Sequence, residues 1–214
     1  MKNLRFLIAA CIVTVLVTLS ACEPAEPEKL PIMGHHRYTE TDTIYHTVQY
    51  FEFYDQDSTL VTPETFKGKV FVADFFFTSC TSICPIMKSQ MGRVYKTFED
   101  NDQVGFLSHS IDPEYDTVER LHDYAGRLGV KSDKWHFVTG DKDAIYEHAN
   151  ESYMVFAAEN ELAQDGIEHS GAFMLVDQDL RIRGAYDGTD TTDVDRLMRD
   201  IPRLLKEYST EDGE

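Results

Sequence analysis

The most constraining stretch of this sequence is an apolar run that leads directly into a pair of cysteines. Residues 71–77 (FVADFFF) are apolar or aromatic apart from one aspartate, and they do not alternate strictly with polar residues. This pattern predicts a strand buried on both faces of a sheet. A Thr/Ser turn with Cys80 follows, and Pro85 comes directly after Cys84. Because proline is favoured in the first turn of a helix, Cys80 is predicted in a loop and Cys84 at or near a helix N-terminus.

The two thiols allow two kinds of chemistry. The positive end of a helix favours the thiolate, which is both a nucleophile and a ligand for soft metals. Cysteines at i and i+4 lie about one helical turn apart, so a disulfide is within reach. Thioredoxin-type oxidoreductases, however, use Cys-x-x-Cys, whereas three residues separate Cys80 from Cys84. The longer spacing also suits two thiolates that converge on Cu(I) or Zn, so both uses stay open here.

A metal bound by only two cysteines needs a further ligand, and imidazole commonly completes such a site. A structural zinc site would require a second close cysteine pair, and Cys11 and Cys22 do not form one with the body of the chain. His169 stands directly before the strand predicted to open the last hairpin, facing the cysteine loop, and is the best candidate. A solvated loop histidine is the alternative. The remaining histidines are predicted on strands, on element surfaces or near the linker: His35, His36, His46, His109, His122, His136 and His148.

Composition narrows the class of partner. The chain has 214 residues and a formal net charge of −18, which argues against nucleic acid, since phosphates must be neutralised by Lys and Arg. The charge also argues against electrostatic binding to an anionic membrane surface. A solvated acidic surface is the default interpretation, and an acidic surface that recruits a protein partner is an alternative. Asp74, inside the apolar strand, either tunes a thiol or is a satisfied buried polar group.

The N-terminus has the pattern of an export signal. Lys2 and Arg5 precede an apolar run over residues 6–19, which is shorter than the ~20 residues of a typical membrane span. The end of this run, Leu-Ser-Ala-Cys22, resembles the bacterial lipobox, which implies cleavage before Cys22 and lipidation of its thiol. An uncleaved anchor helix is the alternative. We therefore expect a lipoprotein signal peptide over residues 1–21 and a flexible, Pro/Glu-rich membrane tether over residues 22–43.

The remainder predicts one domain over residues 44–208 and an acidic tail over 209–214. Strands are predicted at 44–54, 60–62, 70–77, 104–111, 135–139, 172–176 and 181–186, and helices at 85–98, 116–128, 141–149 and 191–208. Alternating strands and helices favour a sheet with parallel strands and helices on both faces, and the antiparallel closing hairpin makes it mixed. A cysteine pair between a strand and the next helix in this order points to an α/β, thioredoxin-like fold with an N-terminal β-hairpin.

Three ordered motifs resemble those of the Sco/SenC family of copper chaperones. Residues 77–85 (FTSCTSICP) resemble its Cys-x-x-x-Cys-Pro motif, and residues 110–117 (SIDPEYDT) resemble its Asp-Pro-Glu-x-Asp-Thr segment. Residues 168–170 (EHS) resemble its Asp-His-Thr/Ser segment, with Glu168 in place of Asp. The resemblance covers residues 47–208. It implies a thioredoxin-like fold, a membrane anchor, and one copper ion, Cu(I) or Cu(II), bound by Cys80, Cys84 and His169.

The resemblance also implies a function. Members deliver copper to the binuclear copper centre of cytochrome c oxidase, and some act as thiol reductases for the cysteines of that centre. We therefore expect a copper-binding chaperone that is lipid-anchored to a bacterial cell membrane through Cys22 and faces the periplasm or the cell exterior. Copper transfer needs no catalytic turnover, so we do not expect an enzyme. The alternative is a thiol–disulfide oxidoreductase that uses Cys80 and Cys84 and does not need His169.

Overall fold

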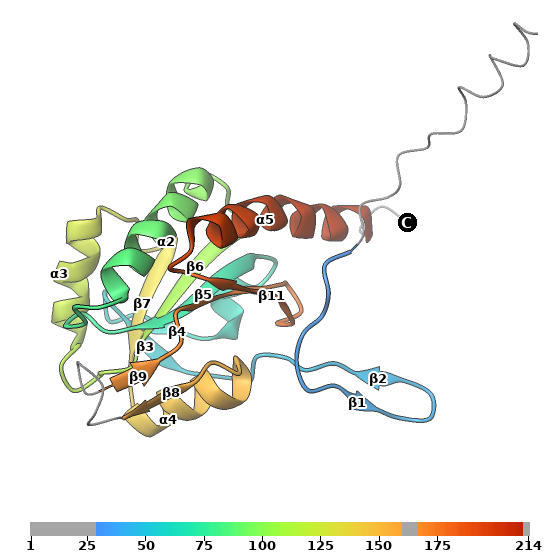
Figure 1. Ribbon diagram of the computed structural model, residues 1–214, viewed down its shortest axis with the longest axis horizontal. Helices are drawn as coiled ribbons and strands as arrows, with labels where there is room; N and C mark the ends of the chain where they lie inside the picture. The colour runs from blue at the N-terminus through green and yellow to red at the C-terminus, as the bar shows by residue number, and fades with distance from the viewer. Residues whose placement is uncertain (1–28, 160–166, 212–214) are drawn as a thin grey trace, which may run out of the picture.

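A mixed seven-stranded sheet forms the centre of the molecule (Figure 1). The computed structural model describes residues 29–159 and 167–211. In sheet order the strands are β11 (Ile182–Asp187), β10 (Ala172–Val176), β5 (Val70–Phe76), β6 (Val104–Ser110), β7 (Trp135–Thr139), β3 (Phe53–Asp55) and β4 (Leu60–Val61). The three strands β5, β6 and β7 run parallel, and the other neighbours pair antiparallel. The predicted mixed sheet, including the N-terminal hairpin β3–β4, is confirmed.

The helices lie on both faces of this sheet, as expected. They are α2 (Cys84–Phe98), α3 (Val118–Leu128), α4 (Lys142–Glu147) and α5 (Thr191–Glu211), with a 3₁₀ turn at η1 (Pro63–Phe66) and a π-helical turn at η2 (His148–Ser152). Helices α2 and α5 cover one face, and α4 lies on the other (Figure 1). Every residue of β5 and β6 is buried, which is the result expected when both faces of a parallel strand are covered.

Two helix starts differ from prediction. Asp116 with Glu119 three residues later predicts a helix cap at Asp116, but the N-cap of α3 is Thr117, whose side chain accepts a hydrogen bond from the backbone of Arg120. For α5 the sequence predicts Thr191 or Thr192 as the cap, but the carboxylate of Asp190 accepts the backbone N–H of Thr192, so the cap lies one residue earlier. Both are shifts of one residue among several competing cap residues in a row. The predicted left-handed glycine after α3, Gly129, is confirmed at φ 66°.

The N-terminal part of the described chain packs onto the body before the sheet begins. The Arg183 guanidinium of β11 donates hydrogen bonds to the backbone carbonyls of Leu30 and Pro31, and the Leu30 N–H donates to Glu207 of α5. The hairpin of β1 (Arg37–Tyr38) and β2 (Thr43–Ile44) then projects away from the body (Figure 1). Structure therefore starts inside the range for which composition predicted a tether.

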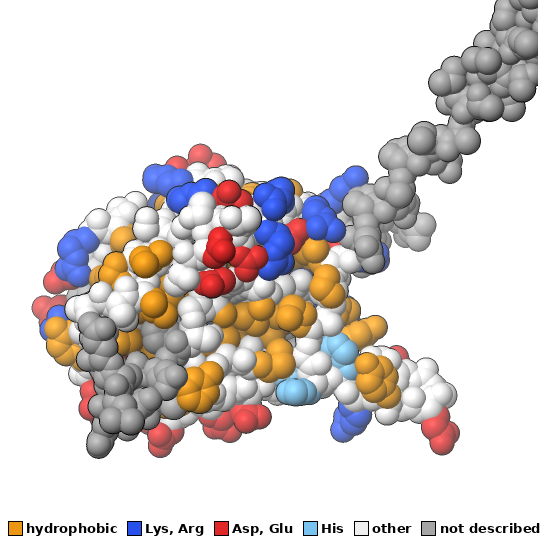
Figure 2. Space-filling view, viewed as in Figure 1, with side chains coloured by type: hydrophobic (Ala, Val, Ile, Leu, Met, Phe, Trp, Pro, Cys, Tyr) orange, Lys and Arg blue, Asp and Glu red, His pale blue; other side chains and the backbone are white. Residues whose placement is uncertain are grey.

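Two further short strands lie outside the main sheet. The short strands β8 (Ala157–Glu159) and β9 (Ile167–His169) form a separate antiparallel pair. Acidic and basic side chains are mixed over α5, and acidic ones line the edge formed by α4 (Figure 2). Within the described ranges, no helix combines the length and apolarity that a membrane crossing requires. The predicted signal peptide and Cys22 lie outside the described residues.

Candidate metal centre

The junction between β5 and α2 places the two cysteines as predicted. Cys80 lies in the turn that follows β5, where its N–H donates to the Phe77 carbonyl at 3.3 Å. Cys84 is the first residue of α2, and Pro85 occupies the first turn. Their exposed fractions are only 7% and 3%, and both are thiols rather than partners in a disulfide. The structure thus presents two shielded thiols at one edge of the sheet.

The cysteine loop is held by a buried carboxylate from the next strand–helix connection. Asp116 is fully buried and accepts the Thr78 N–H at 2.9 Å as well as the Thr78 hydroxyl. It also accepts the Ser110 hydroxyl at 2.7 Å. Three hydrogen bonds to one ionised group form a strong and rigid contact. The segment 110–117, whose sequence resembles a family motif, therefore positions the loop that carries Cys80.

The two thiols differ in acidity. Burial alone would raise the pKa of Cys80, but hydrogen bonds with the Ser82 hydroxyl, at 3.4 Å, and with the Cys84 thiol outweigh it and lower that pKa. Burial raises the pKa of Cys84, and the interaction with Cys80 raises it further. The sequence argument expected the helix N-terminus to lower the pKa of its thiol. That expectation was wrong for Cys84, because loss of hydration exceeds the effect of the helix end.

A buried ion pair lies beneath the thiols. Lys88, one turn along α2 from Cys84, donates to Asp74 at 2.6 Å and to the Ser108 hydroxyl at 2.9 Å. Ser108 donates to the second Asp74 oxygen, and the Lys88 ammonium lies 3.9 Å from the centre of the Phe76 ring. Asp74 is therefore a satisfied buried group. A cavity of about 400 Å³ opens beside this pair, lined by Phe77, Thr78, Cys80, Cys84, Pro85, Lys88, Ser89, Tyr124 and Leu128.

The backbone brings His169 toward the same edge. His169 ends β9, opposite Ala157 of β8, and its side chain lies outside the described atoms. Two residues after it, Gly171 packs against α2 and the residue that precedes α2: a Cβ at this glycine would lie 3.6 Å from the Ile83 side chain and 3.8 Å from Met87. The segment that carries His169 thus adjoins the residue next to Cys84. The structure supports the predicted neighbourhood without describing the imidazole itself.

Other histidines depart from the sequence interpretation. His136 and His148, predicted on surfaces, are buried, and His109 is fully buried in β6. His136 interacts with Asp55 at 2.9 Å, whereas His122 is exposed as expected. In the described part of the chain, no three His, Cys, Asp or Glu side chains gather closely enough to hold a metal ion. A third ligand for the cysteine pair would have to come from residues such as His169, whose side chain is not described.

Sheet, helices and thiols together define a class, that of thioredoxin-like proteins with a cysteine pair at the junction of a strand and a helix. Comparison with known proteins is more specific. The SCO1/SenC family profile matches residues 39–206, and the chain therefore belongs to the SCO1/SenC family. A SCO1 protein homolog of Bacillus subtilis is 33% identical over 162 residues, which is 75% of this chain and 83% of the relative.

Solved structures agree with this assignment. A SCO1/SenC family lipoprotein from Bacillus anthracis matches with a TM-score of 0.68 and 28% identity, over 74% of this chain and 95% of its own. BsSco, described as a cytochrome c oxidase assembly protein with a disulfide switch, matches with a TM-score of 0.66 and 32% identity. The match covers 75% of this chain and 94% of BsSco. Arabidopsis thaliana ScoI, solved with copper bound, matches with a TM-score of 0.64 and 26% identity. The match covers 76% of this chain and 99% of ScoI. The predicted family and thioredoxin-like fold are confirmed.

Proposed function

We propose that this chain binds one copper ion through Cys80, Cys84 and His169 and delivers it to the binuclear copper centre of cytochrome c oxidase during assembly. The observation that carries the proposal is the pair of buried, reduced thiols at the β5–α2 junction, next to the segment that follows His169. Family members are described as binding copper and as cytochrome c oxidase assembly proteins, which supports the same cargo and client here.

The donor set suits copper. Thiolate and imidazole select soft ions, and burial excludes competing water from the thiols. Thiols bind metal only after deprotonation, so loading must release protons. The two thiols contribute unequally, because Cys80 has a lowered pKa and Cys84 a raised one. Cys80 would capture the ion first, and Cys84 would give up its proton as it closes the site; release to the client would proceed by exchange of these ligands one at a time.

We propose further that the body acts outside the cytoplasm, held to the membrane through a lipid on Cys22. Two observations support this: the Leu-Ser-Ala-Cys sequence before the folded body, and the description of the similar Bacillus anthracis protein as a lipoprotein. Cys22→Ser is expected to abolish lipid attachment, as measured by mass spectrometry of the membrane fraction. A protein that keeps its lipid after this change would contradict the anchor site.

The test of the site is an anaerobic Cu(I) titration of the reduced full-length chain. The native chain should bind one copper tightly, and His169→Ala should weaken that binding by about 100-fold or more, because loss of a mere outer partner of a ligand already costs about 10–100-fold. His122→Ala is the matched control, since its imidazole is exposed and lies 2.9 Å from an Asp57 carboxylate oxygen. Unchanged affinity in His169→Ala would remove His169 from the site.

Thiol–disulfide exchange is the second candidate, and the unequal acidity of the thiols favours it. The Cys80 thiolate would attack a client disulfide, releasing one client thiolate and forming a mixed disulfide. Cys84, losing its proton, would then attack the Cys80 sulfur and release the second client thiolate. The client gains two electrons and the chain ends as a disulfide. This activity should survive His169→Ala and disappear in Cys80→Ser, whereas an absence of exchange in the native chain would exclude it.

A further inference from the structure

A second polar cluster lies on the face of the sheet that α2 does not cover. It consists of His109 of β6, His148 of η2 and Tyr153, which follows η2. Their exposed fractions are 0%, 6% and 0%. The Nε2 atoms of both histidines and the Tyr153 hydroxyl have no hydrogen-bond partner in the protein. Buried polar groups are nearly always paired, so three unpaired atoms on neighbouring side chains indicate a missing occupant.

The three rings are mutual neighbours. Their centres lie 5.5 Å apart for His109 and His148, 5.5 Å for His109 and Tyr153, and 5.2 Å for His148 and Tyr153. Two imidazoles that share an ion through nitrogens about 2.0–2.1 Å from it have centres up to about 6 Å apart. The observed spacing falls inside that limit. Aromatic rings pack around the cluster, from Phe51, Phe53 and Phe75.

The surroundings leave the imidazoles prepared to act as ligands. The other ring nitrogen of His109, Nδ1, lies 3.4 Å from the Asp74 carbonyl. A proton on Nδ1 would leave Nε2 with a free lone pair, which is the usual arrangement of a metal-binding histidine. Burial also lowers the pKa of His109, and it lowers that of His148 to about 4, so both rings are neutral at pH 7.

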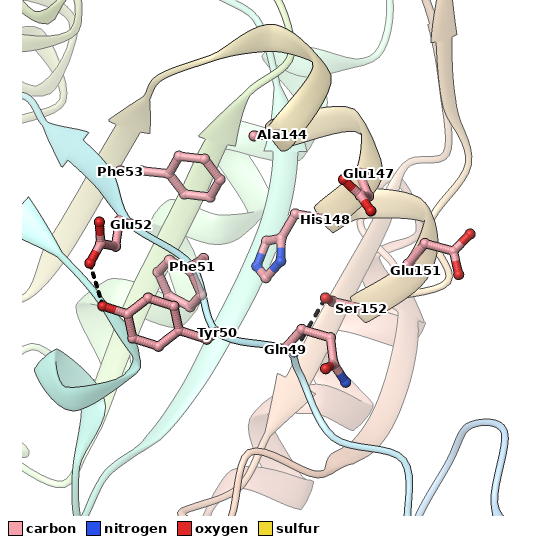
Figure 3. A pocket seen from close by; sticks show the side chains of 10 residues that line it. All are labelled: Gln49, Tyr50, Phe51, Glu52, Phe53, Ala144, Glu147, His148, Glu151 and Ser152. Atoms are coloured by element: carbon pink, nitrogen blue, oxygen red, sulfur yellow. Dashed lines mark hydrogen bonds between the residues drawn. The ribbon is translucent and has the colours of Figure 1, made fainter.

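One member of the cluster lies beside a pocket. His148 lines a pocket of about 490 Å³ between α4, η2 and the segment that leads into β3 (Figure 3). In the close-up, Phe51 and Phe53 lie on one side of its imidazole, and Glu147 and Glu151 lie on the outer side (Figure 3). Glu52 also lines the pocket. The Glu52 carboxylate accepts a hydrogen bond from the Tyr50 hydroxyl. Carboxylates that line a pocket raise the local concentration of cations.

We propose that His109, His148 and Tyr153 bind one Cu²⁺ or Zn²⁺ ion, which enters through the pocket beside His148. Imidazole suits both ions. The two neutral imidazoles would bind through Nε2. Burial raises the pKa of the Tyr153 hydroxyl, so its proton would be displaced to solvent only as the ion binds. The resulting phenolate would neutralise part of the charge of the ion inside the aromatic box. This site needs neither cysteine and is independent of the function proposed above.

A single buried water is the competing occupant. It could donate to both Nε2 atoms and accept from the Tyr153 hydroxyl, which would satisfy the same three atoms. The glutamates that line the pocket favour the ion, since a neutral water gains nothing from negative charge nearby. The two occupants also differ in a measurable way, because only a metal can produce a phenolate-to-metal absorption band.

The test is a Cu²⁺ titration of the full-length chain that carries Cys80→Ser and Cys84→Ser, so that the cysteine pair cannot contribute. We expect a phenolate-to-copper charge-transfer band that saturates at one equivalent, together with a copper-dependent rise in the melting temperature. Adding His148→Phe should lower the affinity at least tenfold and remove the rise. Tyr153→Phe, which deletes a single oxygen and should fold normally, should abolish the band. His122→Phe, on the exposed surface, is the control and should change neither.

Either of two results would overturn the proposal. One is the absence of both band and stabilisation in the cysteine-free chain. The other is a band and stabilisation that persist unchanged in His148→Phe and Tyr153→Phe, which would place copper elsewhere on the chain. In both cases the cluster would hold water.

Discussion

Strands β5 and β6 bury polar side chains on both faces, but only one face provides them all with hydrogen-bond partners. On the face toward α2, Asp74 and Ser108 contact Lys88. Every polar side-chain atom of these three residues has a hydrogen-bond partner. On the other face, one residue further along β6, His109 lies in an aromatic box with its Nε2 unpaired. The two sets are separated only by the thickness of the sheet, since successive side chains point to opposite faces.

The comparison shows that burial and satisfaction are independent properties. Both clusters are at least nine-tenths buried, but one is a closed network and the other has open valences. An unpaired buried polar group costs about 1–3 kcal/mol, so natural proteins rarely keep three together without an occupant. A fully hydrogen-bonded network stabilises one structure, whereas buried polar atoms without partners mark a place where a ligand or water binds. Changes to the two clusters should therefore have different, even opposite, effects on stability.

The largest effect is expected from breaking the closed network. Lys88→Met leaves Asp74 buried without its cation, and we expect the free energy of unfolding to fall by about 3–5 kcal/mol in urea titrations. Lys96→Met is the control, since its ammonium is exposed and pairs with Glu99 at the surface. Adding Asp74→Leu to Lys88→Met should restore most of the stability, because it removes the stranded charge. A loss below about 1 kcal/mol in Lys88→Met would show that the pair is not a closed network.

An intermediate effect is expected from acid. Unfolded histidine has a pKa near 6.5, and burial lowers that of His148 to about 4. Between these values the unfolded chain binds a proton that the folded chain does not, so stability should fall as the pH falls. The loss from His148 should be about 2 kcal/mol between pH 7 and pH 5 in metal-free protein. His148→Phe should remove this share of the slope, leaving the share of His109, whose pKa burial also lowers. His122→Phe should leave the slope unchanged, and equal slopes in both variants would refute the assignment.

The smallest effect on stability is expected from removing one unpaired polar atom. Tyr153→Phe in metal-free protein deletes an unpaired hydroxyl, so the free energy of unfolding should stay the same or rise by up to about 1 kcal/mol. The matched control is Tyr186→Phe, because the Tyr186 hydroxyl is also buried but donates to Asp200 at 3.0 Å. That variant should lose about 1 kcal/mol. A similar loss in both variants would mean that the Tyr153 hydroxyl has a partner in the native protein.

Local patterns in the sequence were enough to predict the sheet and the position of the thiols. The apolar run over residues 70–77, the Pro85 signal and the regular alternation of elements depend on neighbours along the chain, and β5, α2 and the mixed sheet follow from them. Buried parallel strands and helix starts have strong local signatures. His169 was selected from its position before the strand that opens the last hairpin, and the family motif around it pointed to the same residue.

The partners of buried polar groups could not be predicted in this way. The carboxylate of Asp74 meets a lysine 14 residues away, and Asp116 binds a loop 38 residues away. Both contacts depend on how helices settle on the sheet. His148 was placed on the surface of the helix predicted over residues 141–149, but the π-helical turn and the packing of Phe51 enclose it. Burial at the ends of elements depends on tertiary packing, which leaves no periodic signal.

The contacts of Arg183 with the start of the folded chain have a consequence for the order of events during synthesis. The Leu30 N–H binds Glu207, 177 residues later in a chain of 214, and Arg183 binds the Leu30 carbonyl from 153 residues away. Residues 30 and 31 are thus made among the first and find their partners among the last. The segment around residues 30 and 31 cannot dock until α5 has been made. Its attachment is therefore a late step in folding, which requires the whole domain.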